Sequence, residues 1–151
     1  MNSASRSPGV AGMHLRLSSL GTVLVDRADV RSLRAEDPSG GFGLWPGHAD
    51  FLTVLGVGVV SWRAAEGPWH HCAVRRGVLT MRRGSEIEIA TREAVPGDDL
   101  ESLEHVVLAQ LARRQESEDR SRREQRQLEV LALRALVRPL QPQVDRAGSG
   151  P

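Results

Sequence analysis

The amino-acid sequence changes character at Pro96-Gly97, and this change restricts the possible folds more than any other feature. No glycine or proline occurs from residue 98 to residue 138, where good helix formers dominate. Before this point, clusters of glycine, proline, serine and aspartate separate short runs of valine, leucine and isoleucine. The first pattern is typical of helices and the second of short strands joined by turns. We therefore expect a β domain followed by a helical arm.

The β domain is predicted by a repeated alternation of apolar and polar residues. Leu15 and Leu17 alternate with polar neighbours, as do Val23 and Val25, and residues 86–89 read Glu-Ile-Glu-Ile. This period of two is typical of strands with one buried face. The turns between the strands are rich in small and polar residues and fall at 37–41, 46–47, 66–68 and 83–85. Short strands at this spacing predict an antiparallel sandwich or barrel rather than alternating strands and helices.

The C-terminal arm is expected to form an α-helical hairpin. Residues 113–127 are polar on every face and separate two apolar stripes. A single helix across the arm would be about 60 Å long, and its middle would have no apolar face to bury. The spacing of a capping box occurs at Asp98 and Glu101, where the arm begins, and again at Ser121 and Glu124 within the polar stretch. The pattern thus favours two helices whose apolar stripes face each other.

These patterns divide the 151-residue chain into four segments. They are a disordered tail at 1–12, a β-sandwich domain at 13–95, the α-helical hairpin at 98–138 and a loose tail at 139–151. The first tail lacks the apolar middle of a signal peptide, and no apolar run approaches the roughly 18 residues of a membrane span. We therefore expect a soluble, cytosolic protein.

Composition excludes several kinds of chemistry. All 20 basic residues are arginine, so no lysine is available for a Schiff base or for a phosphate-binding loop. The single cysteine, Cys72, excludes a disulfide framework and any zinc module with several cysteines. The 20 basic and 19 acidic residues leave a net charge of only +1, which argues against a dedicated binder of nucleic acids.

No arrangement of residues indicates a catalytic, metal or cofactor site. His70 and Cys72 would share one face of a strand, but two ligands do not make a metal site, and His71 would point to the other face. Cys72 with His48 would be a nucleophile pair without a third residue to orient it. We therefore expect neither enzymatic activity nor a cofactor. Cys72 is interpreted as a small apolar side chain of a half-buried strand.

Arginine residues gather in the polar stretch of the arm, against four acidic residues. The six are Arg113, Arg114, Arg120, Arg122, Arg123 and Arg126. The acidic residues stand at spacings that allow i,i+4 ion pairs, so the stretch is interpreted as solvated helix surface. Nucleic-acid binding would need a longer basic run with interleaved aromatic residues. A free-standing protein- or RNA-binding module with an arginine-rich arm is the alternative class of function.

The most specific pattern of the β domain surrounds the turn at Pro46-Gly47. Phe42, Trp45 and Phe51, three of the five aromatic residues of the chain, flank this turn, and His48 follows it. Aromatic side chains around a rigid turn suit a protein–protein contact. They suit equally well a plug that closes one end of the sandwich. The residues alone leave both interpretations open.

The same segment carries a resemblance to a known family. Residues 43–52 are similar to the Gly-x-Leu-x-Pro-Gly-His-Ala pattern of the epsilon subunit of rotary F-type ATP synthases, called delta in mitochondria. Other segments resemble this family in the same order, namely 14–17, 30–37, 74–79 and 87–90. In the family, the segment matching residues 74–79 runs val-ser-gly-gly-phe-leu. The resemblance spans about residues 14–138 and is closest to the epsilon of alternate F-type ATPases, which are often linked to sodium ions.

The resemblance implies a flattened antiparallel β-sandwich of about ten strands followed by a two-helix hairpin. It implies a non-catalytic central-stalk subunit that binds the gamma subunit and the ring of membrane c subunits and turns with them. Such a subunit lies on the cytoplasmic face of the bacterial inner membrane, held there through the complex only. Its hairpin can reach the catalytic alpha and beta subunits and brake ATP hydrolysis. The coupling ion, a proton or a sodium ion, is set by other subunits.

Individual contacts follow from the resemblance when it is carried over residue by residue. The contact with the gamma subunit would involve Trp45, Pro46, Gly47 and His48. The contact with the c ring would involve Glu36, Asp37, Ser39, Gly40 and Gly41. The six arginines of the arm would pair with acidic residues of a beta subunit when the arm extends, or would only keep the arm soluble.

Two departures from the family change these expectations. Many bacterial members carry an acidic residue just before the Gly-x-Leu pair, whereas Phe42 precedes Gly43 here. We interpret Glu36 and Asp37 as the replacement for that charge. Members that bind ATP carry an arginine where this chain has Glu104, and a carboxylate repels phosphate. We therefore expect no ATP binding.

Overall fold

The computed structural model describes residues 12–137, and seven strands and a helical arm make up this part of the chain. The strands are β1 (Met13–Ser19), β2 (Thr22–Val30), β3 (Ser32–Asp37), β4 (Gly40–Leu44), β5 (Phe51–Arg63), β6 (His70–Arg82) and β7 (Glu86–Gly97). They form one sheet in the order β2-β1-β7-β6-β5-β3-β4. Only β1 and β7 pair in parallel, and the other neighbours are antiparallel.

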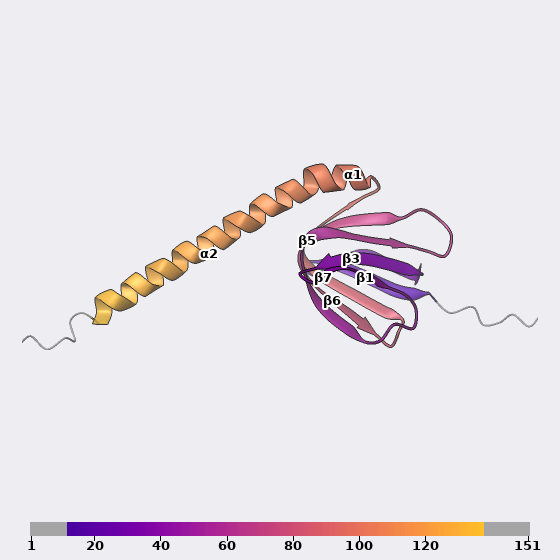
Figure 1. Ribbon diagram of the computed structural model, residues 1–151, viewed down its shortest axis with the longest axis horizontal. Coiled ribbons are helices and arrows are strands. Elements are labelled where there is room, and N and C mark those ends of the chain that lie inside the picture. The colour runs from indigo at the N-terminus through magenta and orange to yellow at the C-terminus, as the bar shows by residue number, and fades with distance from the viewer. Residues whose placement is uncertain (1–11, 138–151) are drawn as a thin grey trace, which may run out of the picture. The chain divides into compact units, whose positions relative to one another are not determined.

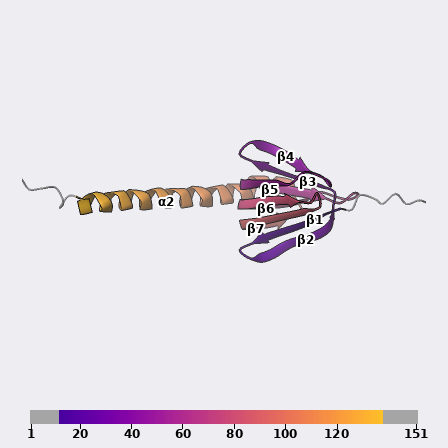
Figure 2. The same ribbon diagram turned by 90° about the horizontal axis from the view of Figure 1, so that it is seen from below.

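The sheet curves so strongly that its inner face encloses a core (Figure 1). Seen from below, the strands spread as a fan from β4 to β2 (Figure 2). The pairing of β5, β6 and β7 skips one position in each strand, namely Gly56, Arg76 and Arg92, and Arg76 has a positive φ of 52°. The three skipped positions lie at the same level of strands that are 12 or 13 residues long, and the register is the same on both sides of them.

Every strand contributes apolar side chains to the core inside the sheet. The buried residues of this core are Met13, Leu15, Leu17, Val30, Leu33, Ala35, Leu44, Leu55, Val60, Trp62, Cys72, Val74, Leu79, Met81, Ile87 and Ile89. They include the alternating leucines of β1 and isoleucines of β7 on which the sequence prediction rested. The predicted class, a β-sandwich followed by a helical arm, is confirmed, although the strands number seven rather than ten. Strands β5, β6 and β7 each continue past the skipped position, and a break in each of them would raise the count by three strands.

The helical arm begins with α1 (Leu100–Ser102), continues through a π-helical turn η1 (Leu103–Val107) and becomes α2 (Leu108–Val137). Asp99 is the N-cap, since its side chain accepts a hydrogen bond from the backbone N–H of Glu101 at 3.2 Å. The cap lies one residue after the predicted Asp98. Gly97 closes β7 tightly against this arm, because a Cβ atom there would lie 2.9 Å from Leu103 Cδ2.

The prediction of a helical hairpin is wrong, because α2 is one continuous helix of 30 residues. Ser121 and Glu124 lie within it, so their capping-box spacing does not start a second helix. Strong helix formers without glycine or proline carry the helix through the polar stretch, and Arg122 and Glu118 form an i,i+4 pair at 4.0 Å. The apolar residues that follow the polar stretch, among them Leu128, Leu131 and Leu136, are exposed.

The chain divides into two compact units within α2, after Gln115. The first unit contains the sheet and the arm up to this residue, and the described part of the second is the rest of α2 from Glu116. In the first unit, Leu103 and Leu111 pack against Ala73 on the outer face of β6. Residues 1–11 and 138–151 lie outside the described residues, and with them all but residue 12 of the predicted tails at 1–12 and 139–151. No helix between residues 12 and 137 has the length and apolar character to cross a bilayer.

Candidate interaction sites

The turn between β4 and β5 presents Trp45 on a rigid backbone. The backbone N–H of His48 donates to the carbonyl of Trp45 at 3.1 Å, and Gly47 has a φ of 86° that favours glycine. The Trp45 side chain is 57% exposed, although its ring lies over Gly43, where a Cβ atom would be 3.2 Å from the ring. A large aromatic ring is thus held on the surface by the turn beneath it.

A second turn supports the first from behind. Gly47 donates its backbone N–H to the carbonyl of Gly84 in the β6–β7 turn at 2.8 Å, and a Cβ atom at Gly84 would lie 2.8 Å from Gly47 Cα. The backbone N–H of Arg83 donates to the Asp50 carboxylate at 2.9 Å. The two turns therefore fix each other in position.

The aromatic side chains around the turn are divided between the core and the surface. Phe42 and Phe51 pack against the core with ring centroids 5.3 Å apart, and His48 meets Phe51 edge-on at 6.0 Å. These side chains close one end of the sandwich. Trp45 points away from the core and remains available for a partner.

The β3–β4 turn, predicted as the c-ring contact, is braced by Asp37. This carboxylate accepts hydrogen bonds from the backbone N–H and hydroxyl of Ser39 and from the hydroxyl of Thr53 at 2.7 Å. These bonds, led by the Ser39 hydroxyl, hold the pKa of Asp37 below its usual value. Asp37 is therefore occupied within the turn, whereas Glu36 beside it is exposed.

An open groove of about 860 Å³ joins residues of both predicted contact regions. Trp45 lines it from the β4–β5 turn, and Glu36 and Gly41 line it from the β3–β4 hairpin. The five-residue β4 separates the two turns, so the two predicted contact regions lie at its two ends and both border this groove. Gly58 of β5 also lines the groove, and a Cβ atom added there would meet no atom within 4 Å.

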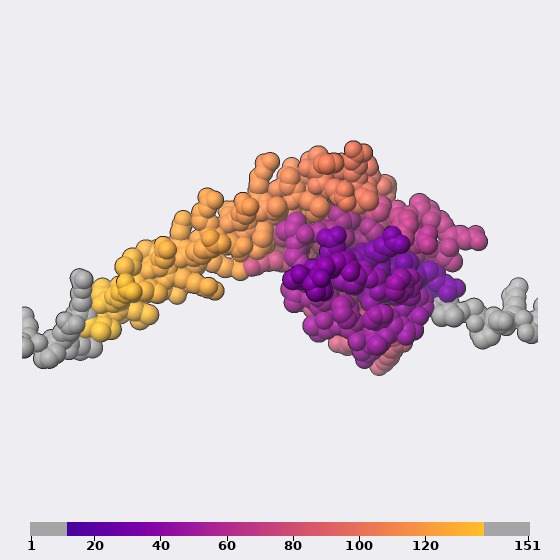
Figure 3. All heavy atoms as spheres, in the orientation of Figure 1, coloured from indigo at the N-terminus to yellow at the C-terminus, as the bar shows by residue number. Residues whose placement is uncertain are grey.

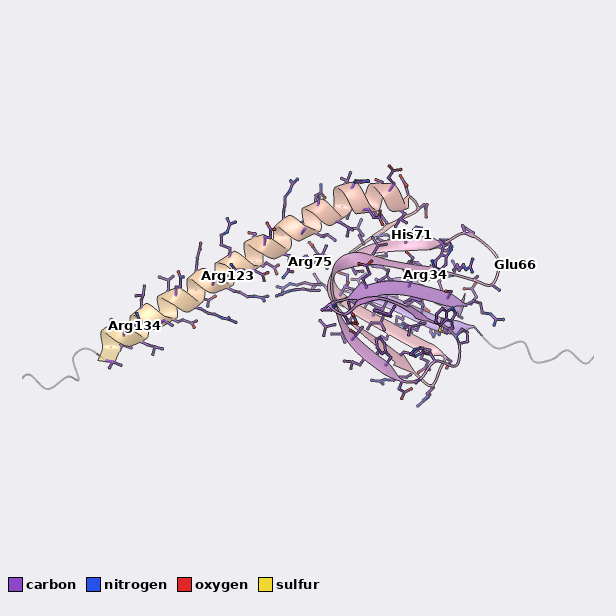
Figure 4. All side chains as sticks on the ribbon, in the orientation of Figure 1. Arg34, Glu66, His71, Arg75, Arg123 and Arg134 are labelled. Carbon is purple, nitrogen blue, oxygen red and sulfur yellow. The ribbon has the colours of Figure 1, made fainter. Side chains whose placement is uncertain are left out.

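Arg34 and Trp69 are groove residues that the sequence reasoning did not single out. The guanidinium groups of Arg34 and Arg63 both stack on the Trp69 ring, at 4.8 and 4.9 Å from its centroid. Arg34 lies on β3 and His71 at the start of β6 (Figure 4). The only sign of these contacts in the sequence was Trp69 itself, which follows the predicted turn at 66–68 and fits neither the strand pattern nor the turn pattern.

The histidines and cysteine of β6 have structural surroundings. His71 Nδ1 and the Ser61 hydroxyl are 2.7 Å apart, and the His70 ring stacks on Trp62. Cys72 is buried in the core, where desolvation raises the pKa of its thiol to about 12. Within residues 12–137, no three histidine, cysteine or acidic side chains are grouped to hold a metal ion.

The predicted arginines of the arm are distributed over both units of the chain. Arg113 and Arg114 belong to the first unit, and Arg114 pairs with Glu93 of β7. Arg120, Arg122 and Arg123 belong to the second unit and are exposed, as is Arg126. Figure 3 shows side chains standing out along the orange and yellow part of α2. Figure 4 labels Arg123 and Arg134 among them.

A buried arginine is the feature that the sequence analysis missed altogether. Arg75 of β6 is only 3% exposed and donates to Glu93 of β7 at 2.9 Å. Alternation did not reveal it, because a charged residue in a strand is normally assigned to the exposed face. The one sign of an unusual residue here was that this chain has Arg75-Arg76 where the family pattern has ser-gly.

Comparison with known proteins gives consistent similarities. The family model described as the β-sandwich domain of the ATP synthase delta/epsilon chain matches residues 12–97. A protein named ATP synthase epsilon chain 2 from Cereibacter sphaeroides is 44% identical over 136 residues, which cover 89% of this chain and 93% of that protein. A protein of the same name from Paraburkholderia xenovorans is 42% identical over 130 residues, covering 86% and 94% of the two chains.

A solved structure is similar in fold. One chain in the cryo-electron microscopy structure of the Euglena gracilis mitochondrial ATP synthase, comprising OSCP, F1 and c-ring, superposes with a TM-score of 0.55. The match has 21% sequence identity and covers 71% of this chain and 63% of that chain. At this identity the superposition supports the fold alone.

Proposed function

This chain belongs to the delta/epsilon family of ATP synthase subunits, and on that premise we propose that it joins the gamma subunit to the c ring through two ends of its sandwich. As an epsilon-type chain it is a non-catalytic subunit of a rotary ATP synthase. The alternative of a free-standing protein- or RNA-binding module has no support among these similarities.

The observation that carries the proposal is the exposed ring of Trp45 on a turn that cannot easily move. Large aromatic side chains held rigidly at the surface lose little conformational entropy on binding and often dominate the energy of an interface. We assign the gamma contact to Trp45, Pro46, Gly47 and His48. The groove beside Trp45 extends this contact, since it offers depth for a side chain of the partner.

The β3–β4 turn is the proposed contact with the c ring, and Glu36 supplies its charge. Asp37 brings the turn into shape by accepting the hydrogen bonds of Ser39 and Thr53. Glu36 is exposed, and the hydrogen bonds that brace the turn go to Asp37, so the Glu36 carboxylate is the one proposed to contact the partner. Neutralising Glu36 is therefore expected to weaken binding to isolated c rings, with Gly40 and Gly41 providing backbone contacts.

The arm is proposed to regulate hydrolysis from the second unit. Arg120, Arg122, Arg123 and Arg126 lie exposed on a helix that continues past the sheet-bound segment. Guanidinium groups form strong bidentate pairs with carboxylates, so an acidic surface of a beta subunit is the proposed partner. The arm carries Glu104 in place of a phosphate-binding arginine, so regulation proceeds without ATP bound to this chain.

The proposed location is the cytoplasmic face of the bacterial inner membrane, reached through the complex. The gamma subunit and c ring hold the chain there, and the complex transports protons or sodium ions. The chain is associated with the membrane through the complex only.

The function is tested by replacing Trp45 and measuring binding to the gamma subunit. Trp45→Ala in the full chain is expected to weaken binding at least about tenfold, which is typical of an aromatic hot spot. Leu20→Ala, at an exposed leucine of the β1–β2 turn, is the control and is expected to bind normally. Equal affinities of the two variants would contradict the assignment of the gamma contact.

A further inference from the structure

The carboxylate of Glu93 bridges the sheet and the helical arm. One of its oxygens, Oε2, accepts a hydrogen bond from Nε of Arg75 on β6 at 2.9 Å. The other oxygen, Oε1, accepts from Nη1 of Arg114 on α2. Arg75 also donates from Nη1 to Oε1 of Gln115 at 3.4 Å. Three elements, β6, β7 and α2, are thus joined through one acidic side chain.

The charges at this bridge are well matched. Glu93 is 26% exposed, and the Arg75 side chain is 4% exposed, so water screens their attraction less than at an open surface. Desolvation alone would raise the pKa of Glu93, but Arg75 and Arg114 outweigh it and hold the pKa below its usual value. Removing either partner of such a pair leaves a poorly solvated charge behind.

The buried apolar contact between the arm and the sheet ends at Leu111, before the bridge. Leu103 and Leu111 are the buried residues of the arm, and they pack against Ala73. Arg114 and Gln115 lie one turn beyond Leu111. The first compact unit ends at Gln115, so the bridge holds the final residues of α2 in that unit.

We propose that Glu93, held by Arg75 and Arg114, is an electrostatic latch that keeps residues 108–115 of α2 on the sheet. When the latch opens, Arg114 becomes available to acidic groups of a partner and the sheet-bound part of the helix shortens. The consequence for hydrolysis rests on the proposed regulatory function of the arm. The family pattern has ser-gly in place of Arg75 and Arg76, so that pattern does not include the arginine on which the latch depends.

The latch is tested by hydrogen exchange of the backbone amides of residues 108–115 in the full-length chain. Arg114→Glu places a carboxylate beside Glu93 and is expected to speed exchange about tenfold, as the loss of a charge-assisted hydrogen bond would. Glu93→Gln removes the charge at the centre and is expected to act in the same direction.

Arg113→Glu is the matched control, because it makes the same charge change one residue away at an exposed position. Its exchange is expected to stay within about twofold of the natural protein. Equal acceleration by Arg113→Glu and Arg114→Glu, or no acceleration by Arg114→Glu, would overturn the latch. Because Arg114 is 61% exposed, its replacement leaves the core intact.

ATPase activity of the assembled complex separates the latch from the regulatory function. If exchange accelerates in Arg114→Glu and hydrolysis also changes, both proposals are supported. If exchange accelerates while hydrolysis is unchanged, the latch stands and the braking function fails. If exchange is unaltered, the latch fails whatever the activity of the complex.

Discussion

Single polar residues in this molecule mainly hold turns in the shape that the contacts require. Asp37 braces the β3–β4 turn, and Asp50 ties the β4–β5 turn to the backbone of Arg83. Both turns carry proposed partner contacts, so the position of Trp45 and of Glu36 depends on neighbours that make no contact with a partner. Substitutions at the bracing and at the contacting residues should therefore differ in their effects.

Asp37 gives the molecule a stability term that depends on pH. Its pKa is lower in the folded chain than its usual value near 3.8, so the stabilisation is present above that pH and is lost as the pH falls through the folded pKa. Asp37→Asn is expected to lower the melting temperature at pH 7, and the difference from the natural protein should shrink toward pH 3. Glu36→Gln, the exposed neighbour, is the control. A difference that is independent of pH, measured by thermal unfolding, would contradict this cause.

Leu20 has a left-handed backbone conformation that suits asparagine better than leucine. The two-residue loop between β1 and β2 has φ values of 49° at Leu20 and 82° at Gly21, and Leu20 is 82% exposed. Asparagine tolerates this left-handed conformation better than leucine. Leu20→Asn is expected to raise stability by about 0.5–1 kcal/mol, or the melting temperature by several degrees.

Leu52→Asn provides the comparison for Leu20→Asn, because Leu52 is also exposed but lies in β5. Asparagine is unfavourable in strands, so this variant should melt at a lower temperature. A lower melting temperature for Leu20→Asn as well would show that the turn does not govern the effect.

At the scale of elements, β5 contains two similar glycines, Gly56 and Gly58, and substitutions at them distinguish an effect on binding from an effect on folding. An added Cβ atom would meet nothing within 4 Å at either Gly56 or Gly58, and neither has a positive φ. Only Gly58 lines the groove beside Trp45. Gly58→Ile is expected to fill the groove and to weaken binding to the gamma subunit by about tenfold or more, while Gly56→Ile binds normally.

Both isoleucine variants are expected to fold, since a β-branched residue suits a strand better than glycine does. Circular dichroism and thermal unfolding check this before binding is compared. Equal binding of Gly56→Ile and Gly58→Ile would remove the groove from the proposed interface and leave Trp45 and its turn as the contact.

The elements were predictable where one physical preference acts alone. Alternation identified the buried faces of β1 and β7, and the absence of glycine and proline identified the helical arm. The hairpin was predicted wrongly because a capping-box spacing at Ser121 was weighed against helix propensity, which carries α2 through without interruption. The buried Arg75 was not predictable, since its burial depends on partners 18 and 40 residues away in the sequence. The aromatic turn at Trp45 was visible in the sequence and its contact with a partner stays a prediction, whereas the groove arises only from the packing of distant strands.

The whole molecule combines a unit that carries the proposed partner contacts with a helical unit that carries exposed arginines and leucines. This division predicts that the two functions separate on truncation after Gln115. The shortened chain retains the sheet, the latch residues and Leu111, so it should bind the gamma subunit normally. ATPase activity of the assembled complex should rise if residues beyond 115 act as a brake, and unchanged activity would discard that role.

As a non-catalytic subunit, this chain works by binding the gamma subunit. Size-exclusion chromatography of the full-length chain with purified gamma subunit from the same organism tests this most directly. The natural chain and Leu20→Ala are expected to co-elute with the gamma subunit as a stable one-to-one complex, and Trp45→Ala is expected to be depleted from it. Elution of the natural chain as a separate species, with gamma subunit in excess, would contradict it.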